Sequence, residues 1–407
     1  MTDVLTRAAA GLPVDWTELR PWLAATGSDL ETLRQAADAA RRAQVGDTVT
    51  YVVNRNINFT NVCVKACRFC AYARGFRSEQ SYRLPVDEVV RRATEAWELG
   101  ATEVCMQAGL APELTGHDYV ALCRAVKAAL PDLHVHAFSP EEVKFGARKS
   151  GWTFEEMLRR LLDVGLGSLP GTSAEILDDA VRQRIAPGRI TTSEWRQVIT
   201  TAHALGIPTT STIMTGHLDT PDDRLAHLDL LRRIQSETGG FTEFVPLSFV
   251  HAEAPMWQAD RPSDLRAGPT PEDVLRFTAV SRLLLGPHIP NLQASWVKEG
   301  LDLATTLLDW GANDLGGTLI NESISTAAGA GHGQRRTPSQ LRAAIRAAGR
   351  PAAERSTLYE LRRTFDGPAD DPVDALDALP DPDHRFGSYA ALAQDQRFTY
   401  SRPRRRD

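Results

Sequence analysis

The stretch Asn58-Phe-Thr-Asn-Val-Cys63-Val-Lys-Ala-Cys67-Arg-Phe-Cys70 carries three cysteines spaced C-x3-C-x2-C, with an aromatic residue before the last one. A structural zinc site needs four ligands, and no fourth cysteine or histidine lies nearby in the sequence. Three thiolates can bind three irons of a 4Fe-4S cluster and leave the fourth iron open to another ligand. The spacing therefore predicts a cluster held by Cys63, Cys67 and Cys70, with a loop of structural or zinc-bound cysteines as the alternative.

The composition narrows the class of protein. The chain has 407 residues, 42% hydrophobic and 24% charged, which is enough for one large barrel or two ordinary domains. With 46 basic and 52 acidic residues, its net charge of −6 gives no overall attraction to nucleic acid. We expect no membrane segment and no signal peptide, because neither apolar pattern occurs. Five cysteines, three of them in one run, favour a reducing cytoplasm over a disulfide scaffold.

Short apolar or β-branched runs alternate with amphipathic stretches through most of the chain. Strands are predicted near residues 52–60, 102–107, 133–138, 166–169, 208–214, 242–247, 289–294 and 312–315. Strands that alternate with helices of this length imply βαβ units and a parallel sheet. Eight such units predict an α/β fold, a closed (β/α)8 barrel of TIM type. An open six-stranded partial barrel is the alternative.

Both ends of the chain differ from this alternating region. Residues 1–48 carry leucines and alanines at helical spacing and predict an N-terminal helical cap rather than a separate domain. We expect the barrel to occupy residues 49–335. Residues 336–407 predict a C-terminal helix and an extended tail. Beyond about residue 350, aspartates followed by a basic run at 402–406 favour a segment that is flexible or lies over the surface.

Polar residues recur near the ends of the predicted strands, which favours a functional site at the carboxyl-terminal face of the barrel. Any one of them alone would be an ordinary hydrogen-bonded structural residue, but their recurrence along the chain indicates a site. The candidates in chain order are Gln107, Gly109, His136, Ser139, Glu175, Thr215, His217, Glu243, His251, Gln293, Asn313 and Asp314.

Longer blocks of the sequence resemble one family. The cysteine spacing resembles that of the radical S-adenosylmethionine (SAM) enzymes, and the rest of residues 45–350 resembles the FO synthase subunit 2 (CofH) family within them. The blocks that carry the resemblance are 54–61, 134–140, 170–177, 202–203, 238–247, 295–298 and 311–318. Aminofutalosine synthase is a sister family that shares several of these blocks.

The resemblance implies a radical SAM barrel with a 4Fe-4S cluster and SAM as cofactors. In that family the open iron binds the methionine end of SAM, and an electron from the cluster releases a 5′-deoxyadenosyl radical. This radical cleaves the side chain of tyrosine, and the p-hydroxybenzyl fragment joins C5 of 5-amino-6-(D-ribitylamino)uracil on the way to coenzyme F-420. A reductant protein is implied as a partner, and FO synthase subunit 1 would be needed for the later ring closure.

The resemblance also suggests which residues meet SAM. Phe69 would lie beside its adenine, and Gln107 and Gly109 would approach its amino group, because a glycine lets backbone come close. Ser139 and Glu175 are candidates to hold its carboxylate, ribose or amine. For Glu175 an ordinary helix-start position is the alternative.

The remaining candidates concern the substrates. His136, His217, Glu243 and His251 are candidate proton-transfer groups, because imidazole and carboxylate can accept protons near pH 7. A packing role is the alternative for each histidine. Candidates for substrate contacts, with Asn313 and Asp314 suited to a ribityl chain or a uracil edge, are Thr215, Gln293, Asn313 and Asp314.

Three positions depart from the family pattern. Ala108 replaces a glycine after Gln107, Thr215 replaces a tyrosine, and Ser248 replaces a proline. These departures leave the cluster chemistry in place but keep open a paralogue, or an aminofutalosine synthase-like enzyme, with another substrate pair. A third class, a non-catalytic iron–sulfur protein, would cleave no SAM.

Overall fold

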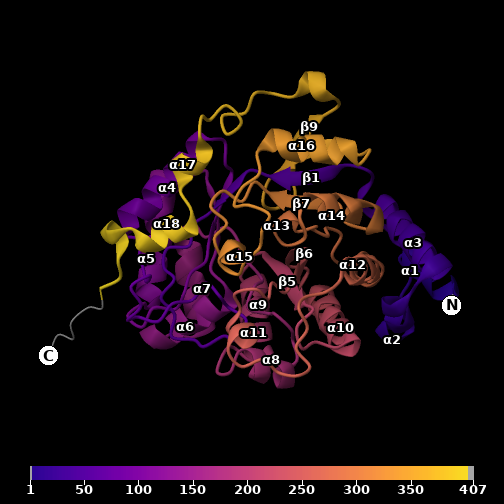
Figure 1. Ribbon diagram of the computed structural model, residues 1–407, viewed down its shortest axis with the longest axis horizontal. Helices are drawn as coiled ribbons and strands as arrows, with labels where there is room; N and C mark the ends of the chain where they lie inside the picture. The colour runs from indigo at the N-terminus through magenta and orange to yellow at the C-terminus, as the bar shows by residue number, and fades with distance from the viewer. Residues whose placement is uncertain (1, 402–407) are drawn as a thin grey trace.

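The computed structural model describes residues 2–401, and its parallel strands form a barrel surrounded by helices (Figure 1). The barrel strands are β1 (Val49–Val52), β2 (Asn54–Asn56), β3 (Glu103–Met106), β4 (His134–Ala137), β5 (Thr209–Thr215), β6 (Phe241–Ser248) and β7 (Asp314–Gly317). β1 and β2 together make the first strand of the ring: β1 pairs with β7, and β2 pairs with β3, which pairs with β4.

Two of the eight predicted strands are reduced to single bridges. Ser168 and Leu169 connect β4 to β5, and Leu292 and Gln293 connect β6 to β7. β5 and β6 pair in parallel along most of their length. The ring is therefore closed at all eight positions. The prediction of a (β/α)8 barrel is confirmed over the six-stranded alternative.

Helices cover the outside of the ring. They are α4 (Val86–Glu98), α5 (Gly116–Ala129), α6 (Pro140–Ser150), α7 (Phe154–Asp163), α8 (Asp179–Ile185), α9 (Thr192–Ala204), α10 (Pro221–Thr238), α11 (Pro255–Gln258), α12 (Pro271–Leu285), α13 (Trp296–Glu299) and α14 (Leu301–Thr306). Several begin at a threonine whose hydroxyl accepts a backbone N–H three residues later, as Thr153 does for α7 and Thr270 for α12. Such capping boxes fix where each loop ends and its helix begins.

The N-terminal region is helical, with α1 (Thr2–Ala9), α2 (Trp16–Leu19) and α3 (Gly27–Val45). α3 packs against α12 on one side of the barrel (Figure 1). Its contact face is built from Leu33 and the small residues Ala37 and Ala40, all fully buried, so the two helix backbones can approach closely.

The C-terminal region adds to the barrel as well as lying over it. Its elements are α15 (Ile324–Ala327), α16 (Pro338–Ala347), β8 (Ala352–Arg355), β9 (Leu361–Phe365), α17 (Pro382–Phe386) and α18 (Tyr389–Gln394). β8 pairs in parallel with β1, and β9 pairs with β8. The expectation that everything after about residue 350 is flexible or superficial is therefore wrong for this hairpin, which brings Arg355 into the barrel.

The segment after β9 runs over the surface to α17 and α18, which lie beside α4 and α5 (Figure 1). Arg385 pairs with Glu95 of α4 at 2.8 Å, and the hydroxyl of Tyr389 donates to the carbonyl of Tyr72 at 3.1 Å. These contacts attach the segment to the loop that carries the cysteines. The basic run predicted as a tail, residues 402–406, lies outside the described residues.

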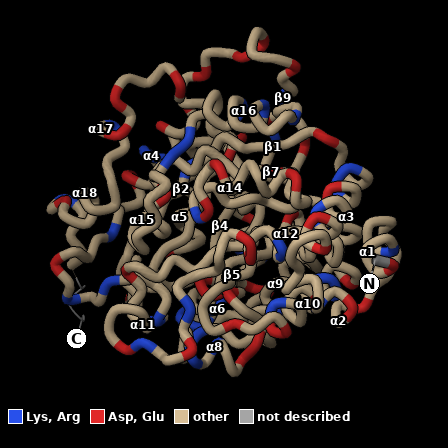
Figure 2. Tube along the Cα trace, turned by 45° about the vertical axis from the view of Figure 1, so that its right-hand side comes forward, with Lys and Arg blue, Asp and Glu red and all other residues tan. Residues whose placement is uncertain are grey.

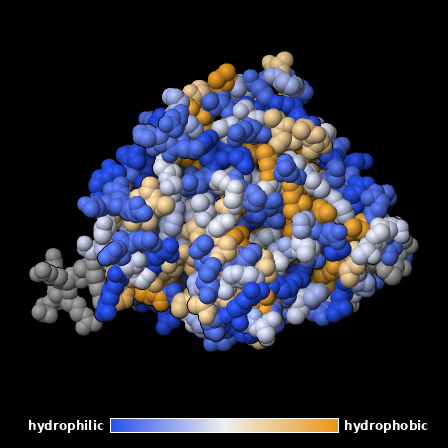
Figure 3. Space-filling view, in the orientation of Figure 1, coloured by the Kyte–Doolittle hydropathy of each residue, from blue (hydrophilic) through white to orange (hydrophobic). Residues whose placement is uncertain are grey.

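The surface carries both signs of charge. Basic and acidic positions are interspersed along the trace in Figure 2, and most of the face seen in Figure 3 is hydrophilic, with apolar residues gathered in a few patches. Within residues 2–401, no helix combines the length and the apolar character needed to cross a bilayer.

Candidate active site

A cavity of about 400 Å³ lies inside the barrel, which is a size typical of small-molecule sites. It extends from the cysteine loop, after the first strand, to polar groups near the starts of β3 and β6. Most of the residues expected from the sequence line it: Cys63, Cys67, Phe69, Cys70, Gln107, Gly109, His136, Ser139, Glu175, Glu243 and Gln293.

The cysteine loop is held by close backbone packing. Gly109 lies so near Val62 that any side chain at position 109 would collide with the backbone there. Its N–H donates to the carbonyl of Thr60 at 2.9 Å. The close approach that we expected from this glycine is thus made to the cysteine loop itself. A rigid loop presents its three half-buried thiols to the same cavity.

The three thiols fit an iron–sulfur cluster better than a single ion. Among residues 2–401, no three His, Cys, Asp or Glu side chains converge as the ligands of one metal ion. In a 4Fe-4S cluster each thiolate binds a different iron, and the three thiols line one cavity, as that ligation needs. Burial raises the pKa of the Cys67 thiol to about 12, so the metal must displace its proton.

Arg189 is the cation closest to this chemistry, and the sequence analysis did not select it. Its guanidinium donates to Glu175 Oε1 at 2.8 Å and to Ser173 Oγ at 2.7 Å, and it lies 5.6 Å from the centre of the Phe69 ring. Glu175 has a φ of 46° in the loop before α8, so the helix-start alternative for it is wrong. We call Cys63, Cys67, Cys70, Phe69 and Arg189 the cluster end of the cavity.

Two candidate SAM contacts already make hydrogen bonds within the protein. Ser139 begins α6, where its hydroxyl donates to Glu142 Oε2 at 2.6 Å. Glu142 also accepts the N–H of Ala108 at 3.0 Å, and burial raises its pKa to about 7. Gln107 Oε1 accepts the hydroxyl of Thr172 at 2.7 Å. Glu142 thus ties the loop after β3 to the start of α6, and SAM contacts by Ser139 and Gln107 stay a prediction.

At the other end of the cavity, four residues form what we call the floor network: Glu243 of β6, Asp314 of β7, Arg355 of β8 and Tyr359 of the following turn. Arg355 makes two hydrogen bonds to Asp314, at 2.5 and 3.0 Å. The Tyr359 hydroxyl donates to Glu243 Oε2, and Arg355 lies 3.7 Å from the same oxygen. Tyr359 reaches this position with a φ of 66°, a strained backbone conformation for a tyrosine.

Glu243 is the member of this network suited to exchange a proton. Burial raises its pKa to about 7; Arg355 acts in the opposite direction, while Asp314 and Glu103 reinforce the increase. Its Oε1 has no hydrogen-bond donor among the described residues. A carboxyl group with one oxygen held and one free, and a pKa near neutrality, can act as a general acid or base.

His136 faces the cavity as a neutral imidazole. Its Nδ1 lies 2.6 Å from Ser168 Oγ, which also contacts His134 Nε2 at 2.7 Å. Burial lowers the pKa of His136 to about 4. At neutral pH it can therefore hydrogen-bond a substrate but carries no charge.

Two candidates at the end of β5 and on the loop after it, Thr215 and His217, lie outside the cavity. His217 is fully buried, with its Nε2 at 2.9 Å from the carbonyl of Met214 and its backbone N–H donating to Asp219. Thr215 lines a separate, much smaller pocket together with Ser248 and Glu299. Neither is among the residues that line the cavity of the cysteines.

The last three candidates are also not brought to the cavity wall. His251 packs its ring against Trp257, 4.3 Å between centres, on the loop after β6. Asn313 is buried and accepts hydrogen bonds from Arg282 at 2.7 Å and from the N–H of Leu292 at 2.8 Å. Asp314 acts behind the wall, through Arg355. A polar residue near a strand end can equally face the outer helix layer, which the strand pattern alone does not decide.

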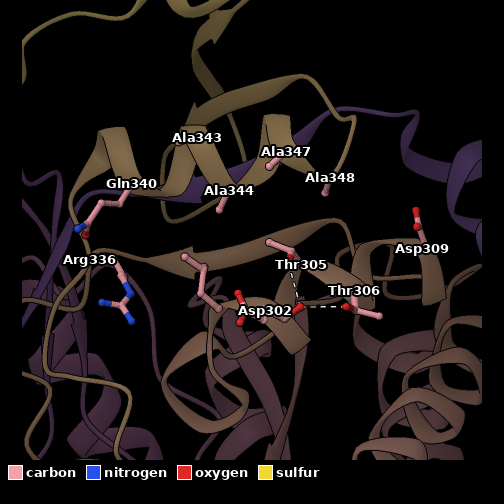
Figure 4. Close-up of a pocket in the computed structure, with 11 residues that line it drawn as sticks. Asp302, Thr305, Thr306, Asp309, Arg336, Gln340, Ala343, Ala344, Ala347 and Ala348 are labelled. Atoms are coloured by element: carbon pink, nitrogen blue, oxygen red, sulfur yellow. Dashed lines mark hydrogen bonds between the residues drawn. The ribbon is translucent and has the colours of Figure 1, made fainter.

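A second hollow lies on the outside, between α14 and α16 (Figure 4). It is lined by alanines of α16 and by Asp302, Thr305 and Thr306, whose two hydroxyls donate to the Asp302 carbonyl at 2.9 Å. It contains no histidine or cysteine and is separate from the barrel cavity.

Family models match most of the chain. Residues 57–231 match the radical SAM superfamily, and residues 238–367 match the CofH/MqnC C-terminal region. The second match includes β8, β9 and the turn with Tyr359.

Curated relatives agree with these matches. The chain is 48% identical to the 5-amino-6-(D-ribitylamino)uracil–L-tyrosine 4-hydroxyphenyl transferase of Methanothermobacter thermautotrophicus, over 88% of this chain and 97% of that protein. It is 51% identical to the FO synthase of Streptomyces avermitilis over 83% of this chain, but it spans only 39% of that protein's length.

Solved structures support the fold. Methylornithine synthase is 19% identical and superposes with a TM-score of 0.64 over 85% of this chain and 95% of that one. The FeFe-hydrogenase maturase HydG from Carboxydothermus hydrogenoformans is 16% identical, with a TM-score of 0.65 over 88% and 80%.

Proposed function

The chain belongs to the CofH family of radical SAM enzymes, and from this premise we propose that it transfers the p-hydroxybenzyl group of tyrosine to 5-amino-6-(D-ribitylamino)uracil. The relative from Methanothermobacter thermautotrophicus, matched over 97% of its length, is named for this substrate pair. One structural observation carries the proposal. A single cavity joins three thiols with no fourth ligand to a separate polar floor, as a reaction that must cleave SAM and then couple two substrates requires.

The cofactors of the family are a 4Fe-4S cluster and SAM. When bound, they supply the one-electron chemistry that removes a hydrogen atom from the substrate. Cys63, Cys67 and Cys70 would hold the cluster. Glu175 and Arg189, beside Phe69, supply a carboxylate and a guanidinium for the polar groups of SAM. Enclosure in the barrel keeps water from a reactive carbon centre.

The floor network provides the proton chemistry. C5 of the diaminouracil carries no hydrogen, so a closed-shell product would form only when the radical adduct loses one electron, for which the oxidised cluster would be the acceptor, and one proton from an N–H of the diaminouracil. Glu243 would accept this proton through its free oxygen. Tyr359 fixes the orientation of this carboxyl by donating to its other oxygen. His136 is neutral, and its Nδ1 is hydrogen-bonded to Ser168. Its other ring nitrogen, Nε2, would hydrogen-bond the phenol or the uracil.

The departures from the family pattern do not remove a polar group from the cavity. Thr215 pairs with Ser248 across β5 and β6, and both line the small separate pocket, while Ser248 and Ala108 also line the barrel cavity. Ala108 contributes its backbone N–H to Glu142.

The partners follow from the length of the relatives. The chain spans 39% of the length of the Streptomyces FO synthase, and we propose an FO synthase subunit 1 activity as the partner for the later ring closure. A reductant protein would supply the electron to the cluster.

The test is an anaerobic reaction of the reconstituted protein with SAM, a strong reductant, tyrosine and the diaminouracil, followed by mass spectrometry. We expect 5′-deoxyadenosine together with a hydroxybenzyl–diaminouracil adduct, and no adduct when either substrate is left out. Deoxyadenosine without adduct in the complete mixture would contradict the substrate pair. Neither product from protein with a full complement of iron and sulfide would contradict the radical SAM assignment.

A further inference from the structure

Four cations line the barrel cavity: Lys65, Arg189, Lys298 and Arg355. Three of them donate to acceptors of the protein itself. Lys298, on α13, is the exception. Within residues 2–401, no hydrogen-bond acceptor and no carboxylate within 4.0 Å faces its ammonium group.

The carboxylates around Lys298 accept hydrogen bonds from groups other than its ammonium. Glu322 accepts the N–H of Ser325 at 3.0 Å with each of its oxygens, Glu299 accepts the hydroxyl of Ser248 at 2.6 Å, and Glu175 holds Arg189. They attract the ammonium from beyond contact distance without neutralising it. Burial lowers the pKa of Lys298, because the charged form loses water without gaining a partner.

Lys298 is half-buried, and an ammonium shielded from water without a partner is costly unless a ligand supplies the anion. Under the proposed function three small molecules enter the cavity, and only SAM and tyrosine carry a carboxylate. Arg189, beside Phe69 and near the thiols, is the cation placed for the carboxylate of SAM. Lys298 is then available for the second one.

Glu322 completes an amino-acid site. It lines the same cavity and is the charge that acts most strongly on Lys298, yet the two groups make no contact. A space between a cation and a carboxylate suits a zwitterion, whose two ends carry the opposite charges. We propose, on the premise of the proposed function, that Lys298 binds the α-carboxylate of the tyrosine substrate and that Glu322 accepts hydrogen bonds from its ammonium group.

The test is ligand binding to the reconstituted holoenzyme with SAM and without reductant, so that no turnover occurs. The probes are tyrosine, tyramine, which lacks the carboxylate, and 3-(4-hydroxyphenyl)propionate, which lacks the amine. Wild-type protein should bind tyrosine at least about tenfold more tightly than either analogue. Lys298→Met should weaken tyrosine binding by roughly 30-fold and leave tyramine unchanged, so that the preference between the two disappears.

Three further variants sharpen the result. Lys298→Arg should keep the preference for tyrosine over tyramine, and Glu322→Gln should lose the preference for tyrosine over the propionate. Lys127→Met is the matched control, because Lys127 lies outside the cavity and its ammonium donates to the carbonyl of Leu133 at 2.9 Å. It should bind all three probes as wild type does. Without ligand, Lys298→Met should melt at or above the wild-type temperature, since it removes an unpaired charge from a half-buried position.

The possible failures are distinguishable. If Lys298→Met still prefers tyrosine over tyramine as wild type does, the inference is wrong and the proposed function stands. If this variant weakens SAM binding instead, Lys298 serves the carboxylate of the cofactor, which also overturns the inference. If wild-type holoenzyme binds SAM but not tyrosine, the proposed function fails and the inference fails with it.

Discussion

The two ends of the cavity are built in opposite ways. At the cluster end, all three cysteines come from one short loop, Cys63 to Cys70. At the floor, Tyr359 and Glu243 meet across 116 positions of the chain, and Arg355 reaches Asp314 from a strand that follows the barrel. The first end is local chemistry on a rigid loop, and the second exists only when the hairpin of β8 and β9 is in place.

This difference suggests that the two ends have separate functions, one in binding the cofactors and the other in transferring substrate protons. The cluster end presents thiols and one strong cation, which suits the cofactors. The floor presents the Glu243 carboxyl, with a pKa near 7, to the cavity, and the neutral imidazole of His136 faces the same cavity, which suits substrate protons. We therefore expect changes at the cluster end to stop every reaction, and changes at the floor to stop coupling while SAM is still cleaved.

The largest effect is expected for Cys67→Ala. Loss of one of three thiolates leaves an iron without its ligand, so both deoxyadenosine and adduct should fall by about three orders of magnitude or more. Iron content and the visible absorption of the cluster should fall in parallel. Cys123→Ala, which changes a buried cysteine of α5 away from the loop, should leave both products unchanged. A cluster that survives intact in the Cys67 variant would break the assignment of this loop.

Glu243→Gln should separate the two ends. Glutamine keeps the size of the side chain but accepts no proton, so adduct formation should fall about 100-fold. Deoxyadenosine formation with tyrosine present should stay within about threefold of wild type. The measurement is the ratio of adduct to deoxyadenosine by mass spectrometry. A parallel fall of both products would mean that the floor also governs SAM cleavage, and the proposed division would be wrong.

Tyr359→Phe should shift a pH profile rather than abolish activity. It removes the hydrogen bond that favours the charged form of Glu243, so the pKa of this carboxyl should rise by about one further unit. If catalysis needs the ionised form, the acid limb of kcat/KM should move to higher pH by the same amount. Tyr389→Phe changes a tyrosine of the same C-terminal region outside the cavity, and its profile should match wild type. An unshifted limb in the Tyr359 variant would show that Tyr359 does not position Glu243.

The same carboxyl predicts a trend in stability. Folding raises the pKa of Glu243 from 4.5 to about 7, so the folded state binds the proton more tightly than the unfolded state. Its contribution to stability is complete below pH 4.5 and is lost as the pH rises towards 7. In Tyr359→Phe the loss should extend to higher pH. Melting temperatures of both proteins between pH 5 and 8, compared with Glu243→Gln, would measure this contribution.

The smallest effect on activity is expected for His217→Ala. The imidazole holds the carbonyl of Met214 in the interior and does not line the cavity. Its loss should lower the free energy of unfolding by about 2–3 kcal/mol and change the kcat of folded protein less than threefold. Denaturant melts and active-site titration separate the two quantities. A 100-fold loss of kcat with unchanged stability would return His217 to the catalytic candidates.

Several features of the site were predictable from residue types alone. The spacing of three cysteines predicts the cluster because its ligands are local, and the alternation of strands and helices predicts the barrel because each element must bury one apolar face. Glu243 and His136 were found because parallel strands direct their polar residues into one interior. The strands expected near 166–169 and 289–294 are reduced to isolated bridges. A short apolar run in the sequence does not distinguish such a bridge from a full strand.

Other residues had no local signal. Arg189 follows a helix in a loop, and Lys298 sits in a four-residue helix, where a basic residue ordinarily faces water. The sequence around Glu142 predicts an acidic residue in the first turn of a helix, and Glu142 does lie there, in α6. Its contact with Ala108 has no such signal, because it depends on packing between two βα units. His217, His251 and Asn313 were predicted as site residues but do not line the cavity. A polar side chain near a strand end can also make its hydrogen bonds or contacts outside the barrel interior.

The barrel and the cluster ligands follow from the amino-acid sequence alone, because periodic burial and ligand spacing are properties of neighbouring residues. Only the tertiary structure decided which charges share the cavity. The C-terminal hairpin brings Arg355 to Asp314, 41 residues earlier, and the turn that follows β8 brings Tyr359 to Glu243, 116 residues earlier. Charges separated in this way meet only after folding, and burial then sets the pKa of Glu243 and leaves Lys298 without a partner.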